Sequence, residues 1–88
     1  MSNAPSVLIV EDHFPLGQFL LHQLTRMACN PTHITKAAEA EQCLETACYN
    51  ATFLDLNLPD ADGFTMLRAW RNRFPAMPII ILTADPHP

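Results

Sequence analysis

The stretch ATFLDLNLPDADGF, residues 51–64, decides the fold of this chain. Its first four residues form a short, mostly apolar run that ends on one carboxylate, Asp55. The loop that follows carries Asn57, Pro59 and Gly63, which are residue types typical of turns. A run of this length before an acid and a turn predicts a buried strand that brings Asp55 to the edge of a sheet.

Apolar runs on either side of this stretch predict the rest of the sheet. Residues 7–10 and 79–82 are continuous apolar runs, the pattern of strands that are buried on both faces. Residues 33–35 are a weaker strand, which we expect at an edge.

Helical spacing separates the predicted strands. Apolar residues recur at steps of three and four over residues 15–27 and again over residues 40–48. Asn30-Pro31 is expected to end the first helix, because the residue before a proline avoids the helical conformation. A third helix, residues 62–74, is expected to begin with its aspartate as N-cap.

Strands and helices therefore alternate, which indicates an α/β fold with a parallel sheet and right-handed crossovers. Eighty-eight residues are too few for two hydrophobic cores, so we expect one domain over residues 5–88. Residues 1–4 are expected to be disordered or left over from cloning.

Composition excludes several classes of protein. The chain is 49% hydrophobic and 16% charged, and its net charge of −4 argues against direct nucleic-acid binding. Cys29, Cys43 and Cys48 lack the C-x-x-C spacing of zinc sites, and we expect Cys43 to be a reduced, buried thiol. We recognise no signal peptide or membrane span, and we expect a cytoplasmic protein.

Acidic residues follow two of the predicted strands. In an open parallel sheet, sites form beyond the carboxyl ends of the strands. Glu11 and Asp12 follow the first strand, Asp55 follows the third, and Thr83 follows the fourth. If the first and third strands are neighbours, three carboxylates converge and raise one another's proton affinity unless a cation compensates.

Oxygen ligands of this kind suit Mg²⁺, which prefers one or two carboxylates together with water and phosphate oxygens. A carboxylate beside such a cation can also attack phosphorus as a nucleophile. Thr83 could then donate a hydrogen bond to a phosphoryl oxygen.

Each residue also has a simpler interpretation. Glu11 and Asp12 could cap the first helix, and Asp55 could be a solvated acid at a strand end. The residues after Asp55 could serve only as a turn. We expect His13 at the surface or in a packing role rather than as a metal ligand.

The chain resembles the receiver domain of two-component response regulators. The resemblance is carried by VLIVED, which closes on Glu11 and Asp12, by FLDLNLPDADG around Asp55, and by IIILTA, which ends on Thr83-Ala84. It covers residues 6–84 and implies a flavodoxin-like parallel sheet with strand order 2-1-3-4.

The resemblance implies that Asp55 is the phosphoacceptor, which receives a phosphoryl group from a histidine kinase or a phosphotransfer protein. Asp12, Asp55 and the backbone carbonyl of Asn57 would bind Mg²⁺ directly, and Glu11 would act through a metal-bound water. Such a domain is a phosphoprotein of signal transduction rather than a turnover enzyme.

Four further residues take their implied roles from the same resemblance. Thr83 would turn onto the phosphorylated aspartate, and Ala84 would be small enough to leave room for the phosphate. Pro59 and Gly63 would shape the loop and the start of the third helix.

Receivers continue with a fourth helix, a fifth strand that ends in a lysine, and a fifth helix, and the 88 residues hold no counterpart of these. We therefore expect a truncated receiver, in which Lys36 does not replace that lysine. The fourth strand would lie at an edge with unpaired backbone groups, which predicts a homodimer through Ile79, Ile80, Ile81 and Leu82.

Three other functions compete with this one. One is a phosphorylation-incompetent truncated receiver that acts as an oligomerising interaction module. An aspartyl phosphatase would need a second acid two residues after the nucleophile, where this chain has Asn57. Dinucleotide binding lacks a G-x-G-x-x-G turn after the first strand.

Overall fold

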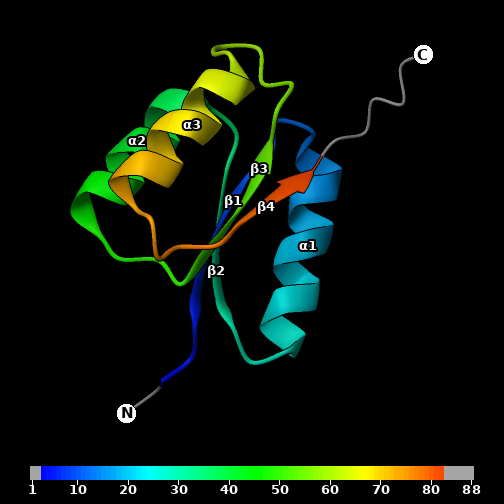
Figure 1. The fold of residues 1–88 in the computed structure, drawn as a ribbon. Helices are drawn as coiled ribbons and strands as arrows, with labels where there is room; N and C mark the ends of the chain where they lie inside the picture. Colours follow the sequence, from blue (N-terminus) through cyan, green and yellow to red (C-terminus); the bar gives the residue numbers. More distant parts are fainter. Residues whose placement is uncertain (1–2, 83–88) are drawn as a thin grey trace.

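Four strands and three helices alternate along the part of the chain that the structure describes (Figure 1). The computed structural model describes residues 3–82. The strands are β1 (Ser6–Val10), β2 (Asn30–Ile34), β3 (Ala51–Asp55) and β4 (Ile79–Leu82). The helices are α1 (Phe14–Arg26), α2 (Ala37–Thr46) and α3 (Gly63–Arg73). The predicted order of elements is confirmed.

The four strands form one parallel sheet in the order β2-β1-β3-β4, which confirms the predicted flavodoxin-like order. The last residue of β1, Val10, lies opposite Ile34 of β2 and Leu54 of β3. Because these strands run in register, the residues that follow β1 emerge beside Asp55 at the same edge of the sheet.

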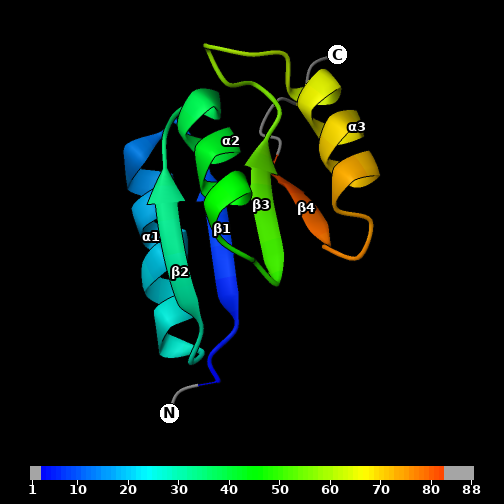
Figure 2. The same ribbon diagram turned by 90° about the vertical axis from the view of Figure 1, so that its left-hand side faces the viewer.

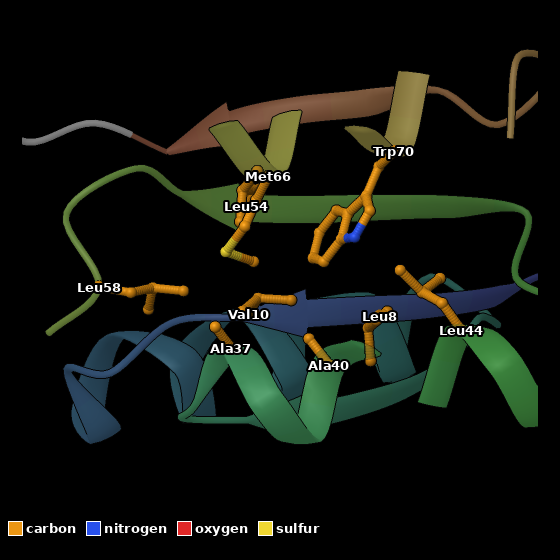
Figure 3. Close-up of a cluster of buried hydrophobic side chains, with 9 residues drawn as sticks. All are labelled: Leu8, Val10, Ala37, Ala40, Leu44, Leu54, Leu58, Met66 and Trp70. Carbon is orange, nitrogen blue, oxygen red and sulfur yellow. The ribbon is translucent and has the colours of Figure 1, made fainter. Parts of the chain in front are cut away.

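Helix α1 covers one face of the sheet, and α2 and α3 cover the other (Figures 1 and 2). The hydrophobic core lies under α2 and α3, where side chains of both helices meet β1 and β3 (Figure 3). Its buried members are Leu8, Val10, Ala37, Ala40, Leu44, Leu54, Leu58, Met66 and Trp70.

The face under α1 is more open. Gly17 is the only buried residue of α1, whereas Leu16 is 37% exposed and Phe19 is 57% exposed. On the neighbouring edge strand, Ile80 is 39% exposed. Within residues 3–82, one helix therefore leaves part of the apolar surface of this face in contact with solvent.

A hydrogen bond and an ion pair join the two helices on the core side. The indole nitrogen of the fully buried Trp70 donates to Oε2 of Glu41 at 2.7 Å. Arg73 donates to the other oxygen of the same carboxylate at 2.9 Å. Glu41 on α2 thus accepts from two residues of α3 and sets the spacing of the two helices.

Helix α1 ends earlier than the sequence predicts. It stops at Arg26, and Ala28 turns the chain with a positive φ of 64°, the left-handed conformation that commonly follows a helix. The prediction that Asn30-Pro31 ends the helix is wrong, because both residues begin β2. A proline is tolerated there because β2 is an edge strand of the sheet.

Helix α2 also ends earlier than the predicted residues 40–48. Its last residue is Thr46, so Cys48 lies beyond the helix and is exposed. Cys43 is a free thiol that packs against the core but is only partly buried, which corrects the expectation of a buried one. None of the helices within residues 3–82 is long and apolar enough to cross a membrane.

We expect Glu41→Ala to lower the free energy of unfolding by roughly 1–3 kcal/mol, because it leaves the buried Trp70 indole N–H without its acceptor. Urea denaturation followed by tryptophan fluorescence measures this loss. Glu45→Ala is the matched control, because it removes a more exposed carboxylate of the same helix, 4.0 Å from Arg73. It should change stability by less than about 0.5 kcal/mol, and equal losses in both variants would contradict the assignment.

Candidate functional site

Three carboxylates meet at the carboxyl edge of the sheet. One oxygen from each of Glu11, Asp12 and Asp55 lies within 4.8 Å of the other two. Glu11 and Asp55 are buried, whereas Asp12 is exposed. The predicted convergence of these residues, which we call the acidic trio, is confirmed.

Glu11 is held in place by hydrogen bonds from several directions. Its backbone N–H donates to the carbonyl of Ile34 on β2 at 3.1 Å. Its carbonyl oxygen lies 2.9 Å from Nε2 of His33, also on β2. Its carboxylate oxygen Oε2 accepts from the backbone N–H of His13 at 3.1 Å. Both the main chain and the side chain of Glu11 are therefore fixed.

The electrostatics of the trio favour a cation. Burial raises the pKa of Glu11 from its ordinary value of 4.5 to about 7, and the neighbouring Asp55 and Asp12 add to this rise. The hydrogen bond from the His13 backbone opposes the rise in the pKa of Glu11. Repulsion between the carboxylates favours the protonated form of Glu11. A divalent cation among these oxygens would offset that repulsion. The donor set therefore fits Mg²⁺.

The loop after β3 is shaped around Asp55. The backbone N–H of Asn57 donates to Oδ1 of Asp55 at 2.9 Å. Leu58 is buried and anchors the loop, whereas Pro59 is exposed at its turn. Gly63 is buried at the start of α3, where an added Cβ would overlap the backbone of Leu56. The chain can fold back closely here only with glycine.

The acids of this loop cap two different helices. Asp62 accepts from the N–H of Phe64 at 3.2 Å, so the expected N-cap of α3 is confirmed. Asp60 accepts from the N–H groups of Ala37 and Ala38 at the start of α2. These hydrogen bonds lower the pKa of Asp60.

The cap made by Asp60 joins residues more than twenty positions apart, so local sequence patterns could not reveal it. No local side chain takes its place, because Lys36, the residue before α2, makes no cap hydrogen bond with its side chain. Through Asp60, the loop that follows Asp55 is bonded to the start of α2.

The acidic trio lines a cleft of about 600 Å³. His13, Leu16, Asn57 and Leu82 complete its walls. The start of α1 is capped by His13, whose Nδ1 accepts from the N–H of Leu16 at 3.4 Å. The alternative that Glu11 and Asp12 cap α1 is therefore wrong, and His13 has a structural role.

A second groove, of about 620 Å³, lies at the opposite end of the sheet, between the ends of α2 and α3. It is lined mainly by residues 44–50 and 74–77. Among the residues that the structure describes, the acidic trio is the one group of three or more potential metal ligands, so the chemistry belongs to the first cleft. Thr83 and Ala84, predicted to contact phosphate, lie outside the described residues.

Comparison with known proteins gives a consistent picture. The model of the response regulator receiver domain matches residues 7–87. The swarming motility regulation protein RssB of Serratia marcescens is 40% identical over 79 residues, which are 90% of this chain and 36% of that protein. The transcriptional regulatory protein BasR of Escherichia coli is 42% identical over 80 residues, which are 89% of this chain and 35% of BasR.

Among solved structures, the chemotaxis response regulator CheY4 of Vibrio cholerae superposes with a TM-score of 0.88 at 25% identity. The match covers 98% of this chain and 73% of CheY4. The chain spans about a third of the length of the two curated relatives, whose remaining parts have no counterpart among these 88 residues.

We expect the free energy of unfolding to fall as the pH rises from about 5 to about 8, because the raised pKa of Glu11 lets the folded state hold a proton that the unfolded state releases. Urea denaturation at several pH values measures this slope. In Glu11→Gln the slope should flatten over the same range. An unchanged slope in that variant would assign the titration to another group.

Proposed function

This chain belongs to the response regulator receiver domain family, and on that premise we propose that it accepts a phosphoryl group on Asp55 in a Mg²⁺-dependent reaction. The donor is a histidine kinase or a phosphotransfer protein of a two-component system. The observation that carries the proposal is the convergence of Glu11, Asp12 and Asp55 in one cleft. The domain is a phosphoacceptor rather than a turnover enzyme.

Asp12 and Asp55 would hold Mg²⁺ directly, together with the backbone carbonyl of Asn57, and Glu11 would act through a bound water. The burial of Glu11 beside Asp55 supports this assignment, since it raises the pKa of Glu11 to about 7 and positive charge nearby would favour the ionised carboxylate. When bound, Mg²⁺ supplies positive charge to the carboxylates and to the oxygens of the incoming phosphoryl group.

The two oxygens of Asp55 have different roles in this proposal. Oδ1 accepts a hydrogen bond from the N–H of Asn57, which sets the plane of the carboxylate. Oδ2 attacks phosphorus, so that an O–P bond forms while the N–P bond to the donor histidine breaks and its electron pair returns to the imidazole. The product is an acyl phosphate on Asp55.

The remaining roles in the site are also proposals. Pro59 and Gly63 shape the loop that presents Asp55, as the turn and the close backbone approach at Leu56 support. Thr83 would donate a hydrogen bond to the phosphoryl group, and Ala84 would leave room for it. The domain would span residues 5–88. It would act in the cytoplasm, where ATP is available to phosphorylate the donor kinase.

The alternative of a phosphorylation-incompetent interaction module is not favoured. Burying Glu11 against Asp55 raises the pKa of Glu11 and costs stability at neutral pH. A module that only binds other proteins gains nothing from this cost, whereas a site for a cation and a phosphoryl group requires it.

We expect acetyl phosphate, a small-molecule phosphodonor, to add one phosphoryl group to the protein in the presence of Mg²⁺, as intact-protein mass spectrometry measures. Asp55→Asn and chelation of Mg²⁺ should each abolish the added mass. Asp62→Asn is the matched control, since it removes the charge of a loop acid outside the trio and should still be phosphorylated. Phosphorylation that persists in Asp55→Asn would refute Asp55 as the acceptor.

We further propose that two copies associate through β4. Within residues 3–82 this strand pairs only with β3, and Ile80 is 39% exposed on it. An unpaired apolar edge of this kind readily pairs with a second chain, and a two-fold dimer is the simplest closed arrangement. The net charge of −4 favours a protein partner over nucleic acid.

We expect light scattering to give the mass of a dimer at micromolar concentration. Ile80→Lys should shift the protein to a monomer, because it places a charge on the pairing edge. Ala69→Lys adds the same charge to the exposed surface of α3 and should leave the dimer intact. A monomeric wild type that melts cooperatively would contradict the proposal.

A further inference from the structure

We propose that His33 is a positioning residue for the acidic trio. It acts through the main chain of Glu11 and does not itself touch the cation or the phosphoryl group. The inference rests on the proposed function, because it explains how the Mg²⁺ site is kept in shape. His33 lies on β2, on the other side of β1 from Asp55.

The imidazole ring of His33 is partly buried and contacts residues of α1. Its Nε2 lies 2.9 Å from the carbonyl oxygen of Glu11, and its Nδ1 lies 3.0 Å from the side-chain nitrogen of Gln18. The ring of Phe14 contacts it with a centroid distance of 5.5 Å. Both ring nitrogens therefore have a partner, and an aromatic ring covers the imidazole.

These partners determine where the hydrogen of the neutral ring lies. A carbonyl oxygen can only accept, so Nε2 carries the hydrogen and donates it to Glu11. Nδ1 is then the acceptor for the side-chain amide of Gln18. Gln18 thus selects the tautomer that bonds to Glu11.

This bond sets the direction of the chain as it leaves β1. The N–H of Glu11 already donates to Ile34, the neighbour of His33 on β2. The carbonyl of Glu11 and the nitrogen of Asp12 belong to one planar peptide unit. Because His33 fixes that carbonyl, it also fixes the plane from which Asp12 extends into the cleft.

The packing of α1 leaves room for this arrangement at one position. Gly17 is the buried residue of α1, and a Cβ added to it would overlap the imidazole ring of His33. Any larger residue at position 17 would push the ring away from Glu11. Three residues near the start of α1, Phe14, Gly17 and Gln18, therefore hold the imidazole ring of His33 in place.

The test compares Mg²⁺ affinity, by isothermal titration calorimetry, in the wild type and in two variants of His33. His33→Phe keeps a ring against Phe14 but has no donor for the Glu11 carbonyl, and we expect about tenfold weaker binding, the scale of a lost second-layer contact. His33→Gln places an amide N–H near the position of Nε2 and should recover most of the affinity.

Two further variants separate positioning from stability. Val7→Ala removes two buried methyl groups near the start of β1, at the end of the strand away from the acidic trio. It should lower the melting temperature without changing Mg²⁺ affinity. Gly17→Ala keeps every hydrogen-bonding group but displaces the ring, and should weaken Mg²⁺ binding as His33→Phe does.

The outcomes distinguish this inference from the proposed function. Full Mg²⁺ affinity in His33→Phe, with Asp55-dependent binding in the wild type, would overturn the role of His33 and leave the phosphoacceptor proposal standing. Equal weakening in His33→Gln and His33→Phe, or in Val7→Ala, would reduce His33 to a general structural residue. A wild type that binds no Mg²⁺ would overturn both proposals.

Discussion

The parallel pairing of β1 with β3 is the constraint on which the rest of the structure depends. It sets Val10 opposite Leu54, so that the next residues of both strands leave the sheet side by side. Parallel strands share one carboxyl edge, and acids that follow them must therefore meet. A shift of this pairing by one residue would turn Asp55 to the other face and separate it from Glu11.

Burying acids at this edge has an energetic cost that the surrounding structure offsets. Burial raises the pKa of Glu11 to about 7, and backbone hydrogen bonds from His13 and Asn57 orient the carboxylates of Glu11 and Asp55. The burial of apolar side chains in the core under α2 and α3 stabilises the fold and offsets the cost of burying these acids. The site is thus strained electrostatically while its frame is firmly packed.

Sequence patterns located the strands and all three acids, because those features depend on local apolar runs and on the rules of parallel sheets, whereas the strand order came from the resemblance to receiver domains. The same patterns placed the ends of α1 and α2 too late. The turn at Ala28 has a left-handed backbone conformation that alanine rarely adopts, so the residue type did not predict the turn. The cap at α2 comes from Asp60, a residue distant in sequence.

The sequence by itself determined the α/β class, the acids at the carboxyl edge and the resemblance to receiver domains, since each depends on short runs of adjacent residues. Only the tertiary structure decided that His13, rather than Glu11 or Asp12, caps α1. It also decided that His33 bonds to the carbonyl of Glu11 and that Asp60 caps α2. The His33 and Asp60 contacts join residues more than twenty positions apart, and their geometry exists only once helices and strands have packed.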